Sequence, residues 1–209
     1  MESGPIVRVY DSMLWRHSPA AMAMLQISAR NEFRMISRAL QYHNSLEAVL
    51  DIASGTGRYS RLLAEQWPAA TVFGLDLSMP MLNHAGKINQ KTGMSGIHLI
   101  HCDAMTLPFS EESFDGIVCS GALHLFPDLY HVLTQINRVM KVSGRFVFAA
   151  FCNPSGRVWD TLEKFSARYF GLTPLHLCTL KTLLHHAKFV DLQIHYQKGL
   201  WIIASAAKA

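Results

Sequence analysis

The 209-residue sequence has little of what nucleic-acid-binding proteins concentrate. Only 16% of its residues are charged and the net charge is +4. The basic residues are scattered along the sequence, without a run of five or six, whereas a nucleic-acid footprint usually gathers such charge on one face. The sequence therefore predicts no nucleic-acid partner.

Cysteines are few and far apart. None of Cys102, Cys119, Cys152 and Cys178 forms a CxxC pair. Because structural metal sites and dithiol motifs need such close spacing, no metal site is expected. Reduced, buried cysteines are usual in cytosolic proteins. We therefore expect a cytoplasmic protein that holds no metal.

Long hydrophobic runs are also missing. The longest, such as residues 146–151, are far shorter than the roughly 20 apolar residues of a membrane helix. Residues 1–10 lack the hydrophobic core of a signal peptide. Hydrophobic residues nevertheless make up 50% of the chain, which suffices for one continuous core. The sequence predicts a single domain, 1–209, with no membrane span.

An amphipathic helix is predicted before the first strand. Ser18 and Pro19 combine a capping residue with a proline at the first helical position. Apolar residues then recur at steps of three and four as far as about His43, which is the spacing of one helical face. We expect this helix to pack against the rest of the domain.

The middle of the sequence alternates between short apolar runs and amphipathic helical patterns. The apolar runs lie at residues 48–53, 71–76, 97–102, 114–120 and 145–151. This alternation is typical of a parallel sheet covered by helices on both faces, a doubly wound α/β fold.

The last two apolar runs break this rhythm. Residues 190–195 and 200–205 are separated by only about four residues. Since a parallel crossover needs a dozen or more residues, the two runs must form an antiparallel hairpin. We expect five parallel strands closed by an antiparallel C-terminal hairpin, unlike the usual dinucleotide-binding sheet.

A glycine-containing loop, residues 51–57, follows the first predicted strand. Its glycines allow close approach to a ligand at a helix N-terminus. A dinucleotide loop is the obvious alternative, but Ser60 stands where that pattern has its third glycine. The Asp51 carboxylate, expected to face the ligand, would repel a pyrophosphate by roughly 4 kcal/mol at contact. The same charge would attract an ammonium or a sulfonium group.

Two further acids follow neighbouring strands. Asp76 ends the second strand, where it could accept hydrogen bonds from ribose hydroxyls, and Asp103 follows the third, where it could accept one from an adenine amine. Each acid alone could equally be a helix cap or a solvated turn residue. Together with Asp51, they would line the crevice in which open α/β sheets bind ligands. The sequence thus predicts a site for a cationic nucleoside.

These segments resemble the motifs of the class I S-adenosylmethionine-dependent methyltransferases, in the small-molecule branch of the ubiquinone and menaquinone methyltransferases. The resemblance covers residues 49–151 closely and the terminal hairpin loosely. Its motifs lie at residues 49–57, 72–82, 102–109, 113–119 and 138–145. Ser54 departs from the more usual glycine or cysteine, and Val142 and Ser143 depart from Pro-Gly in a turn remote from the cofactor.

The resemblance implies a Rossmann-like fold and S-adenosyl-L-methionine as the cofactor, with roles assigned by position. Residues Asp51 and Ala53, Ser54, Gly55, Thr56 and Gly57 would hold its methionine portion. Asp76 would bind the ribose and Asp103 the adenine amine. The adenine ring would lie between Leu77, Met81, Ala104 and Met105, with Ser120 and Gly121 at the floor of the methyl-donor site.

The resemblance also divides the domain. It implies N-terminal lid helices at 1–46, a cofactor-binding core at 47–151, a substrate-cover segment at 152–188 and the terminal hairpin at 189–209. Tyr10, Trp15 and Trp159 lie in the two covering segments and are candidates to contact the substrate. Their aromatic side chains favour a flat or lipophilic acceptor, although they could equally pack helices onto the sheet.

Methyl transfer needs a general base only if the acceptor is protonated. His124, just beyond the fourth strand, could take a phenol or enol proton, or could simply anchor its loop. We expect transfer to an oxygen or carbon atom of a small molecule. A protein or RNA methyltransferase and a catalytically silent methyltransferase-like partner remain alternatives, and an NAD-dependent oxidoreductase is a more distant one. The oligomeric state is not predicted.

Overall fold

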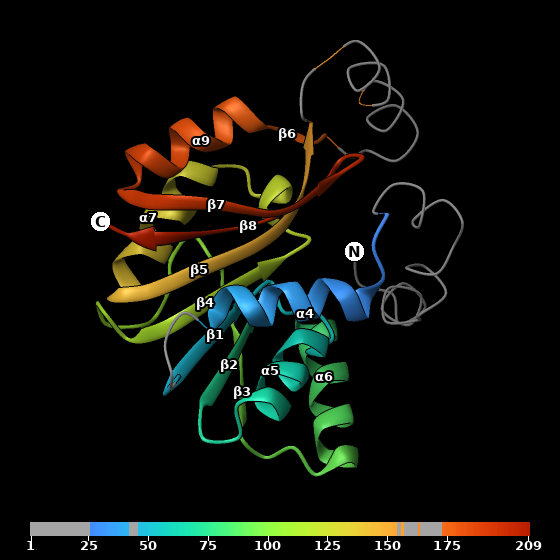
Figure 1. The fold of residues 1–209 in the computed structure, drawn as a ribbon. Coiled ribbons are helices and arrows are strands. Elements are labelled where there is room, and N and C mark those ends of the chain that lie inside the picture. Colours follow the sequence, from blue (N-terminus) through green and yellow to red (C-terminus); the bar gives the residue numbers. More distant parts are fainter. Residues whose placement is uncertain (1–25, 42–45, 154–155, 157–162, 164–172) are drawn as a thin grey trace.

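The computed structural model describes residues 26–41, 46–153, 156, 163 and 173–209. A single twisted sheet runs through these residues (Figure 1). Its seven main strands are β1 (Ala48–Ile52), β2 (Thr71–Asp76), β3 (Ile97–His101), β4 (Phe114–Ser120), β5 (Met140–Asn153), β7 (Phe189–Lys198) and β8 (Trp201–Lys208). They lie in the order β3-β2-β1-β4-β5-β8-β7.

The pairing directions confirm the predicted topology. The first five strands are parallel to one another. β8 pairs antiparallel with β5, with Arg145 opposite Ala207 and Phe151 opposite Trp201, and β7 pairs antiparallel with β8 at the edge. A two-residue strand, β6 (Leu175–His176), adds to the end of β5. The fold is therefore a Rossmann-like α/β sheet closed by an antiparallel hairpin.

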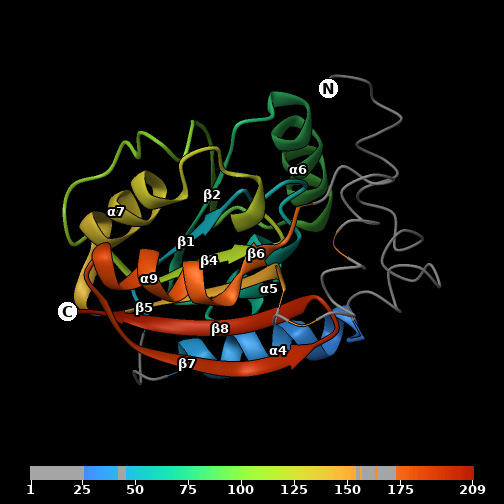
Figure 2. The same ribbon diagram turned by 90° about the horizontal axis from the view of Figure 1, so that it is seen from above.

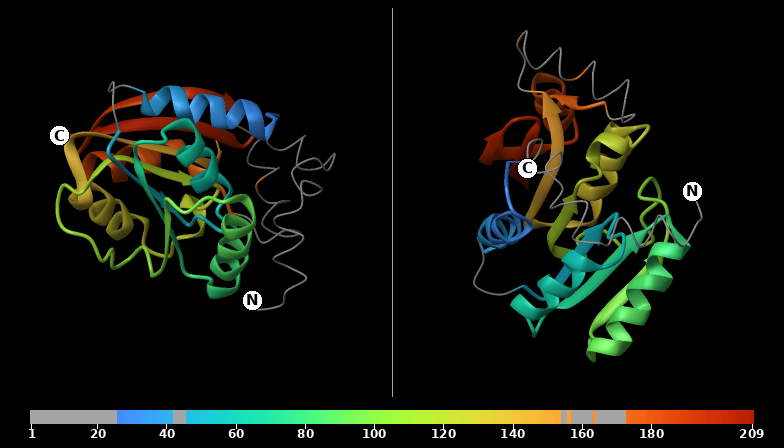
Figure 3. Two further views of the ribbon diagram at one scale, coloured as in Figure 1. Left: turned by 90° about the horizontal axis from the view of Figure 1, so that it is seen from below. Right: turned by 90° about the vertical axis from the view of Figure 1, so that its right-hand side faces the viewer.

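Helices cover both faces of this sheet (Figures 1 and 2). One face carries α4 (Ala29–Leu40), α5 (Arg58–Gln66) and α6 (Met79–Thr92), and the other carries α7 (Leu129–Val139) and α9 (Leu177–His186). A short 3-10 helix, η1 (Leu123–Leu125), follows β4. Figure 3 shows α4 lying across the sheet on the same side as α5.

Alternate residues of the central strands enter two separate cores. Leu50, Ile117 and Phe148 pack with α7 and α9, whereas Val49 and Val118 pack with α4 and α5. Because side chains of a strand alternate between the two faces, a strand buried on both sides must be apolar throughout. This burial explains the continuous apolar runs in the sequence.

The predicted N-terminal helix is wrong in its extent. Gln26 adopts a left-handed conformation with a φ of 51°, Ser28 is extended, and the helix begins only at Ala29. The side chain of Ser28 accepts a hydrogen bond from the Asn31 backbone, which caps the helix. The predicted start at Ser18 and Pro19 lies outside the described residues. β5 also begins earlier than predicted, at Met140 instead of Arg145.

Candidate active site

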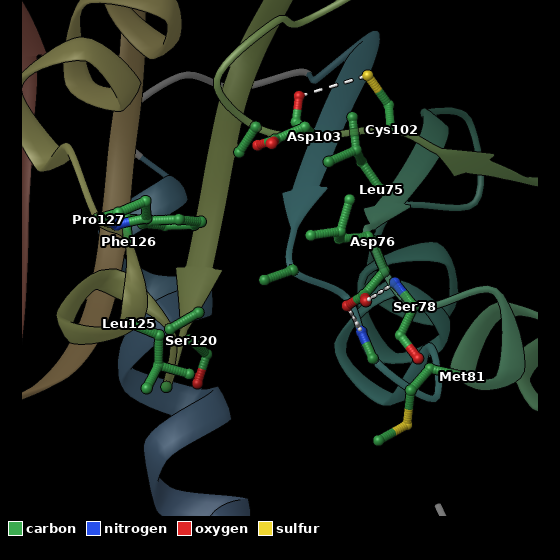
Figure 4. A pocket seen from close by; sticks show the side chains of 16 residues that line it. Leu75, Asp76, Ser78, Met81, Cys102, Asp103, Ser120, Leu125, Phe126 and Pro127 are labelled. Carbon is green, nitrogen blue, oxygen red and sulfur yellow. Dashed lines mark hydrogen bonds between the residues drawn. The ribbon is translucent and has the colours of Figure 1, made fainter. Parts of the chain in front are cut away.

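A pocket opens at the carboxyl ends of β1, β2, β3 and β4 (Figure 4). Its volume of about 410 Å³ falls within the range of roughly 300–1,000 Å³ that small-molecule sites occupy. The described residues that line it are Ala53, Gly55, Leu75, Asp76, Leu77, Ser78, Met81, Cys102, Asp103, Ala104, Ser120, Gly121, Ala122, Leu125, Phe126 and Pro127.

The glycine loop forms one wall of this pocket through a repeated left-handed backbone. Ala53, Gly55 and Gly57 have φ angles of 55°, 56° and 73°. The Ser54 N–H donates to the Leu75 carbonyl at 2.9 Å, so the loop is fixed against β2. Gly57 is the N-cap residue of α5 and provides no side-chain cap, while Asp51 accepts a hydrogen bond from the backbone N–H of Ser60 in the first turn.

Asp76 joins this loop to the start of α6. Its Oδ2 atom accepts a 2.7 Å hydrogen bond from the Gly55 N–H, and its Oδ1 atom accepts one of 2.8 Å from the Ser78 N–H. Figure 4 shows the carboxylate between these two segments at the pocket wall. Each carboxylate oxygen has a second lone pair, so Asp76 can still accept from ligand hydroxyls.

Asp51 does not face the pocket as predicted. Its side chain lies beneath the loop, 2% exposed, and accepts a 2.6 Å hydrogen bond from the Ser60 hydroxyl. Burial and, to a smaller extent, the charge of Asp76 raise the pKa of Asp51 to about 7, although the bond from Ser60 acts in the opposite direction. At neutral pH this carboxyl is therefore only partly ionised.

The close approach of the loop, α5 and β2 depends on a glycine. A Cβ atom at Gly74 would lie 2.8 Å from the Ser60 Oγ and 3.2 Å from the Ser54 Oγ. Any side chain at this position would push these serines away from β2. Gly74 thus allows Ser60 to reach Asp51 and allows the glycine loop to lie flat on the sheet.

The loop after β3 forms the opposite end of the pocket. Asp103 accepts a 2.9 Å hydrogen bond from the Met105 N–H onto its Oδ1 atom, and its exposed carboxylate borders the pocket beside Ala104. Arg138 supports the rest of this loop by donating to the carbonyls of Phe109 and Leu107, at 2.7 and 2.9 Å. The Asp103 side chain is thus held at the pocket while remaining open to a ligand.

The end of β4 connects the pocket to helix α4. Ser120 lines the pocket and donates a 2.8 Å hydrogen bond to the Glu32 carboxylate. The Tyr59 hydroxyl donates to the same Glu32 oxygen at 2.5 Å. Glu32 is completely buried. Sequence reasoning missed this glutamate, because nothing in its neighbours along the chain sets it apart from a surface residue of α4.

The segment after β4 supplies an apolar wall. Leu125, Phe126 and Pro127 line the pocket there, and sequence reasoning did not single them out. His124 is not among the described lining residues. Its ring packs edge-on against Phe151, with ring centroids 5.1 Å apart, and burial lowers the pKa of His124 to about 4. The imidazole is consequently neutral at physiological pH.

The structure thus brings together most of the predicted site residues, but not all. Those lining the pocket are Ala53, Gly55, Asp76, Leu77, Met81, Asp103, Ala104, Ser120 and Gly121. The predicted residues that do not line it are Asp51, Ser54, Thr56, Gly57, Met105 and His124. Tyr10, Trp15 and Trp159 lie outside the described residues.

The charge of the pocket has one sign. The described lining residues include two carboxylates, Asp76 and Asp103, and no lysine, arginine or histidine. A diphosphate would find no positive side chain here, whereas a cation would be attracted by both acids. This composition fits a positively charged ligand.

The described residues offer neither a metal site nor a membrane-spanning helix. They contain no group of three or more histidine, cysteine, aspartate or glutamate side chains suited to a metal ion. Among the helices they form, none is both long enough and apolar enough to cross a membrane.

Comparison with known proteins relates this site to a family. Residues 49–144 match a family model described as a methyltransferase domain. The chain is 30% identical over 131 residues to the demethylmenaquinone methyltransferase of Thermus thermophilus, an alignment that covers 63% of this chain and 59% of that protein. The chain thus spans less than two thirds of the length of this curated relative.

Solved structures agree on the fold. A phosphoethanolamine N-methyltransferase of Haemonchus contortus, bound to S-adenosylhomocysteine, superposes with a TM-score of 0.74 at 16% identity, covering 86% of this chain and 53% of that one. A geranyl diphosphate C-methyltransferase of Streptomyces coelicolor gives 0.73 at 12% identity, covering 86% and 79%. These enzymes methylate different kinds of atom, so the fold alone leaves the acceptor open. Residues 49–144 thus match a methyltransferase domain, and their motifs and sheet order resemble those of the class I S-adenosylmethionine-dependent methyltransferases.

Proposed function

We propose that the pocket binds S-adenosyl-L-methionine and that the protein transfers the methyl group to an oxygen or carbon atom of a small aromatic or lipophilic acceptor. The observation that carries this proposal is the charge of the pocket, whose described lining has two carboxylates and no basic side chain. A cationic donor fits this composition, whereas a dinucleotide diphosphate does not.

The lining residues suit the parts of this donor in order. Asp76, held by two backbone N–H groups, would accept the ribose hydroxyls, and the exposed Asp103 carboxylate would accept the adenine amine. Leu77, Met81 and Ala104 would contact the adenine ring. At the other end, the glycine loop from Ala53 and the end of β4 at Ser120 and Gly121 would hold the methionine portion.

The bound donor supplies a methyl group on a positively charged sulfur, which becomes neutral as the bond breaks. The protein's own task is to align the acceptor and exclude water, which can contribute on the order of 7–11 kcal/mol. His124 is the candidate general base, because its neutral imidazole can accept a proton and its neighbour Leu125 lines the pocket. Burial lowers its pKa to about 4, which makes it a weaker base than an exposed histidine.

The pocket mouth favours a lipophilic acceptor. Leu77 and Leu125 both line the pocket, yet their side chains are 66% and 61% exposed. Exposed apolar side chains around a cavity often mark a surface that a ligand covers. The similarity to a demethylmenaquinone methyltransferase supports a quinol or phenol. The expected lid (1–46) and substrate-cover segment (152–188) lie in part outside the described residues, and their described helices, α4 and α9, pack on the two faces of the sheet.

One observation favours a polyanionic acceptor such as RNA instead. Arg30, Arg34 and Arg38 lie one helical turn apart on α4 and border a second hollow of about 320 Å³. Among the described residues, none of the three forms an ion pair with a carboxylate. The sequence had suggested scattered basic residues. This arrangement gathers three of them, although on the outer side of α4 and not in the pocket.

Thermal unfolding in the presence of either S-adenosylhomocysteine or NAD tests which cofactor the pocket binds. S-Adenosylhomocysteine at 100 times its Kd should stabilise the protein by about 2.7 kcal/mol, which corresponds to a Tm increase of roughly 5–10 °C for a chain of this size. NAD at the same concentration should leave Tm unchanged. The reverse result would refute a methyltransferase site.

A substrate screen then tests the acceptor. Methyl transfer from labelled S-adenosylmethionine to quinols, phenols and polyketide or fatty acids should give product with at least one of the aromatic classes. Transfer to RNA that weakens steeply with salt would support the polyanionic alternative. Tight cofactor binding without transfer to any acceptor would favour a catalytically silent partner protein.

A further inference from the structure

A buried acid outside the matched family segment contacts the wall of the pocket. Glu32 lies in the first turn of α4 and is 0% exposed. Its Oε1 atom accepts hydrogen bonds from the hydroxyls of Tyr59 in α5 and Ser120 at the end of β4. Three elements that are distant in sequence thus meet at one carboxylate oxygen.

The hydrogen bonds around Glu32 suit a charged carboxylate. Two hydroxyl groups donate to a single oxygen, at donor–acceptor distances of 2.5 and 2.8 Å, and short O–H···O contacts are typical of charged acceptors. Burial and then the charge of Glu32 raise the pKa of the neighbouring Tyr196. A position in the first turn of a helix also favours a negative side chain.

Glu32 is separated from the pocket by a single hydroxyl group. Ser120, its hydrogen-bond partner, lines the pocket, and Figure 4 shows α4 running beside Ser120, at the end of the pocket away from Asp103. Under the proposed function, this is the end that holds the methionine portion and its sulfonium. A buried charge can act on a ligand beyond the intervening Ser120 side chain because little water screens it.

The other acids near the pocket do not place a charge at the β4 side. Asp51 is buried and only partly ionised near neutral pH, and Asp103 lies at the opposite end of the pocket (Figure 4). Asp76 is placed beside the glycine loop by two backbone N–H groups. Glu32 therefore adds a negative charge behind Ser120, on the β4 side of the pocket.

We propose that Glu32 is a charge-recognition residue of the donor pocket: through Ser120, its carboxylate stabilises bound S-adenosylmethionine relative to S-adenosylhomocysteine, whose sulfur is neutral. This inference rests on the proposed function. It assigns to helix α4, outside residues 49–144, a part in distinguishing the donor from the product. The loss of sulfur charge during transfer would weaken this attraction and favour product release.

Calorimetric titration of both ligands tests the proposal. Glu32→Gln preserves the shape of the side chain and removes its charge. We expect the ratio of the Kd for S-adenosylmethionine to the Kd for S-adenosylhomocysteine to rise roughly tenfold, equivalent to about 1.4 kcal/mol. Tyr59→Phe is the matched control, because it removes one hydrogen bond to the same oxygen but retains the charge. The ratio of the two Kd values in Tyr59→Phe should equal that of the wild type.

The outcomes distinguish failure of the Glu32 inference from failure of the proposed function. If the wild type binds both ligands and Glu32→Gln weakens them in equal proportion, Glu32 has only a structural role and the inference is overturned. If the wild type binds neither ligand, the proposed function fails and the inference fails with it. Should Glu32→Gln not fold, Glu32→Leu combined with Tyr59→Phe removes the charge together with one hydroxyl that it satisfies, and the same ratio decides.

Discussion

The Ser60 hydroxyl donates a 2.6 Å hydrogen bond to the Asp51 carboxyl group. This bond joins the first helix after the glycine loop to the strand before it, underneath the loop itself. Burial raises the pKa of Asp51 to about 7, so the folded protein retains a proton here that the unfolded chain, with a pKa of 3.8, has lost.

Asp51→Asn should change the pH dependence of stability. Because the folded pKa is raised, the stabilisation associated with this proton is complete below about pH 4 and is lost as the pH rises through 7, with a slope of up to about 1.4 kcal/mol per pH unit. The free energy of unfolding of Asp51→Asn, measured with urea between pH 4.5 and 8, should lack this decline. Parallel curves for variant and wild type would refute the raised pKa.

His124→Phe should change the pH dependence of stability in the opposite direction to Asp51→Asn. Burial lowers the pKa of His124 to about 4, so its contribution to stability is present above pH 6.5 and is lost as the pH falls through 4. Phenylalanine retains the ring contact with Phe151 but cannot be protonated. Urea unfolding at pH 4.5 and 7.5 should show a smaller acid loss for the variant. Because the contributions of Asp51 and His124 change in opposite directions between pH 4 and 6.5, each effect is measured as the difference in free energy of unfolding between variant and wild type at each pH.

The catalytic role of His124 has a separate readout. If its imidazole is the general base, His124→Ala should lower kcat at least a hundredfold, and the acid limb of the wild-type rate profile should fall near pH 4 and not near 6.5. Turnover retained by His124→Ala with an identified acceptor would leave alignment alone as the source of catalysis.

Asp76→Asn should weaken cofactor binding more than it weakens the fold. The amide replaces one of the two acceptor oxygens that hold Gly55 and Ser78 and cannot accept both ribose hydroxyls. We expect a loss of at least tenfold in affinity for S-adenosylhomocysteine, measured by calorimetry, with about 1–3 kcal/mol of lost stability.

Asp115→Asn is the control for this substitution. Asp115 also accepts two backbone N–H bonds, from Glu47 and Ala48 at 2.9 Å, but it does not line the pocket. This variant should lose stability while binding the cofactor normally. Equal losses of affinity in Asp76→Asn and Asp115→Asn would mean that the ribose assignment is wrong.

Ala53→Gly should stabilise the protein. Ala53 has a φ of 55°, a left-handed conformation that costs a residue with a side chain about 1–2 kcal/mol, and glycine avoids that cost at a smaller entropic penalty. We expect a gain of up to about 1 kcal/mol in urea unfolding. Gly55→Ala, at a φ of 56°, should lose stability, so changes of the same sign would contradict this account.

The sheet was predictable because its burial leaves a simple pattern. Strands such as β1 and β4 are covered on both faces and so are apolar throughout, and the short gap before Trp201 permits only a hairpin. The start of α4 was not predictable, because the apolar spacing continues across Gln26, which has a left-handed backbone and lies before the helix. No local signal marks that break.

The site was predictable where motif position determines it and not where tertiary contacts do. Asp76 and Asp103 follow strand ends, and both border the pocket. The direction of Asp51 depends on which face of β1 it occupies, and Ser60 draws it beneath the loop. Glu32 acquires its role from Tyr59 and Ser120, which lie 27 and 88 residues away. Such contacts exist only in the folded chain.

The insertion of β8 between β5 and β7 has a consequence for aggregation. β5 pairs with a strand about 60 residues further along the chain, so this contact forms late compared with local ones. Until it forms, β5 presents an apolar edge of unpaired backbone groups to other molecules. The hairpin therefore protects the sheet from intermolecular association, and substitutions that loosen it should appear first as insolubility during expression.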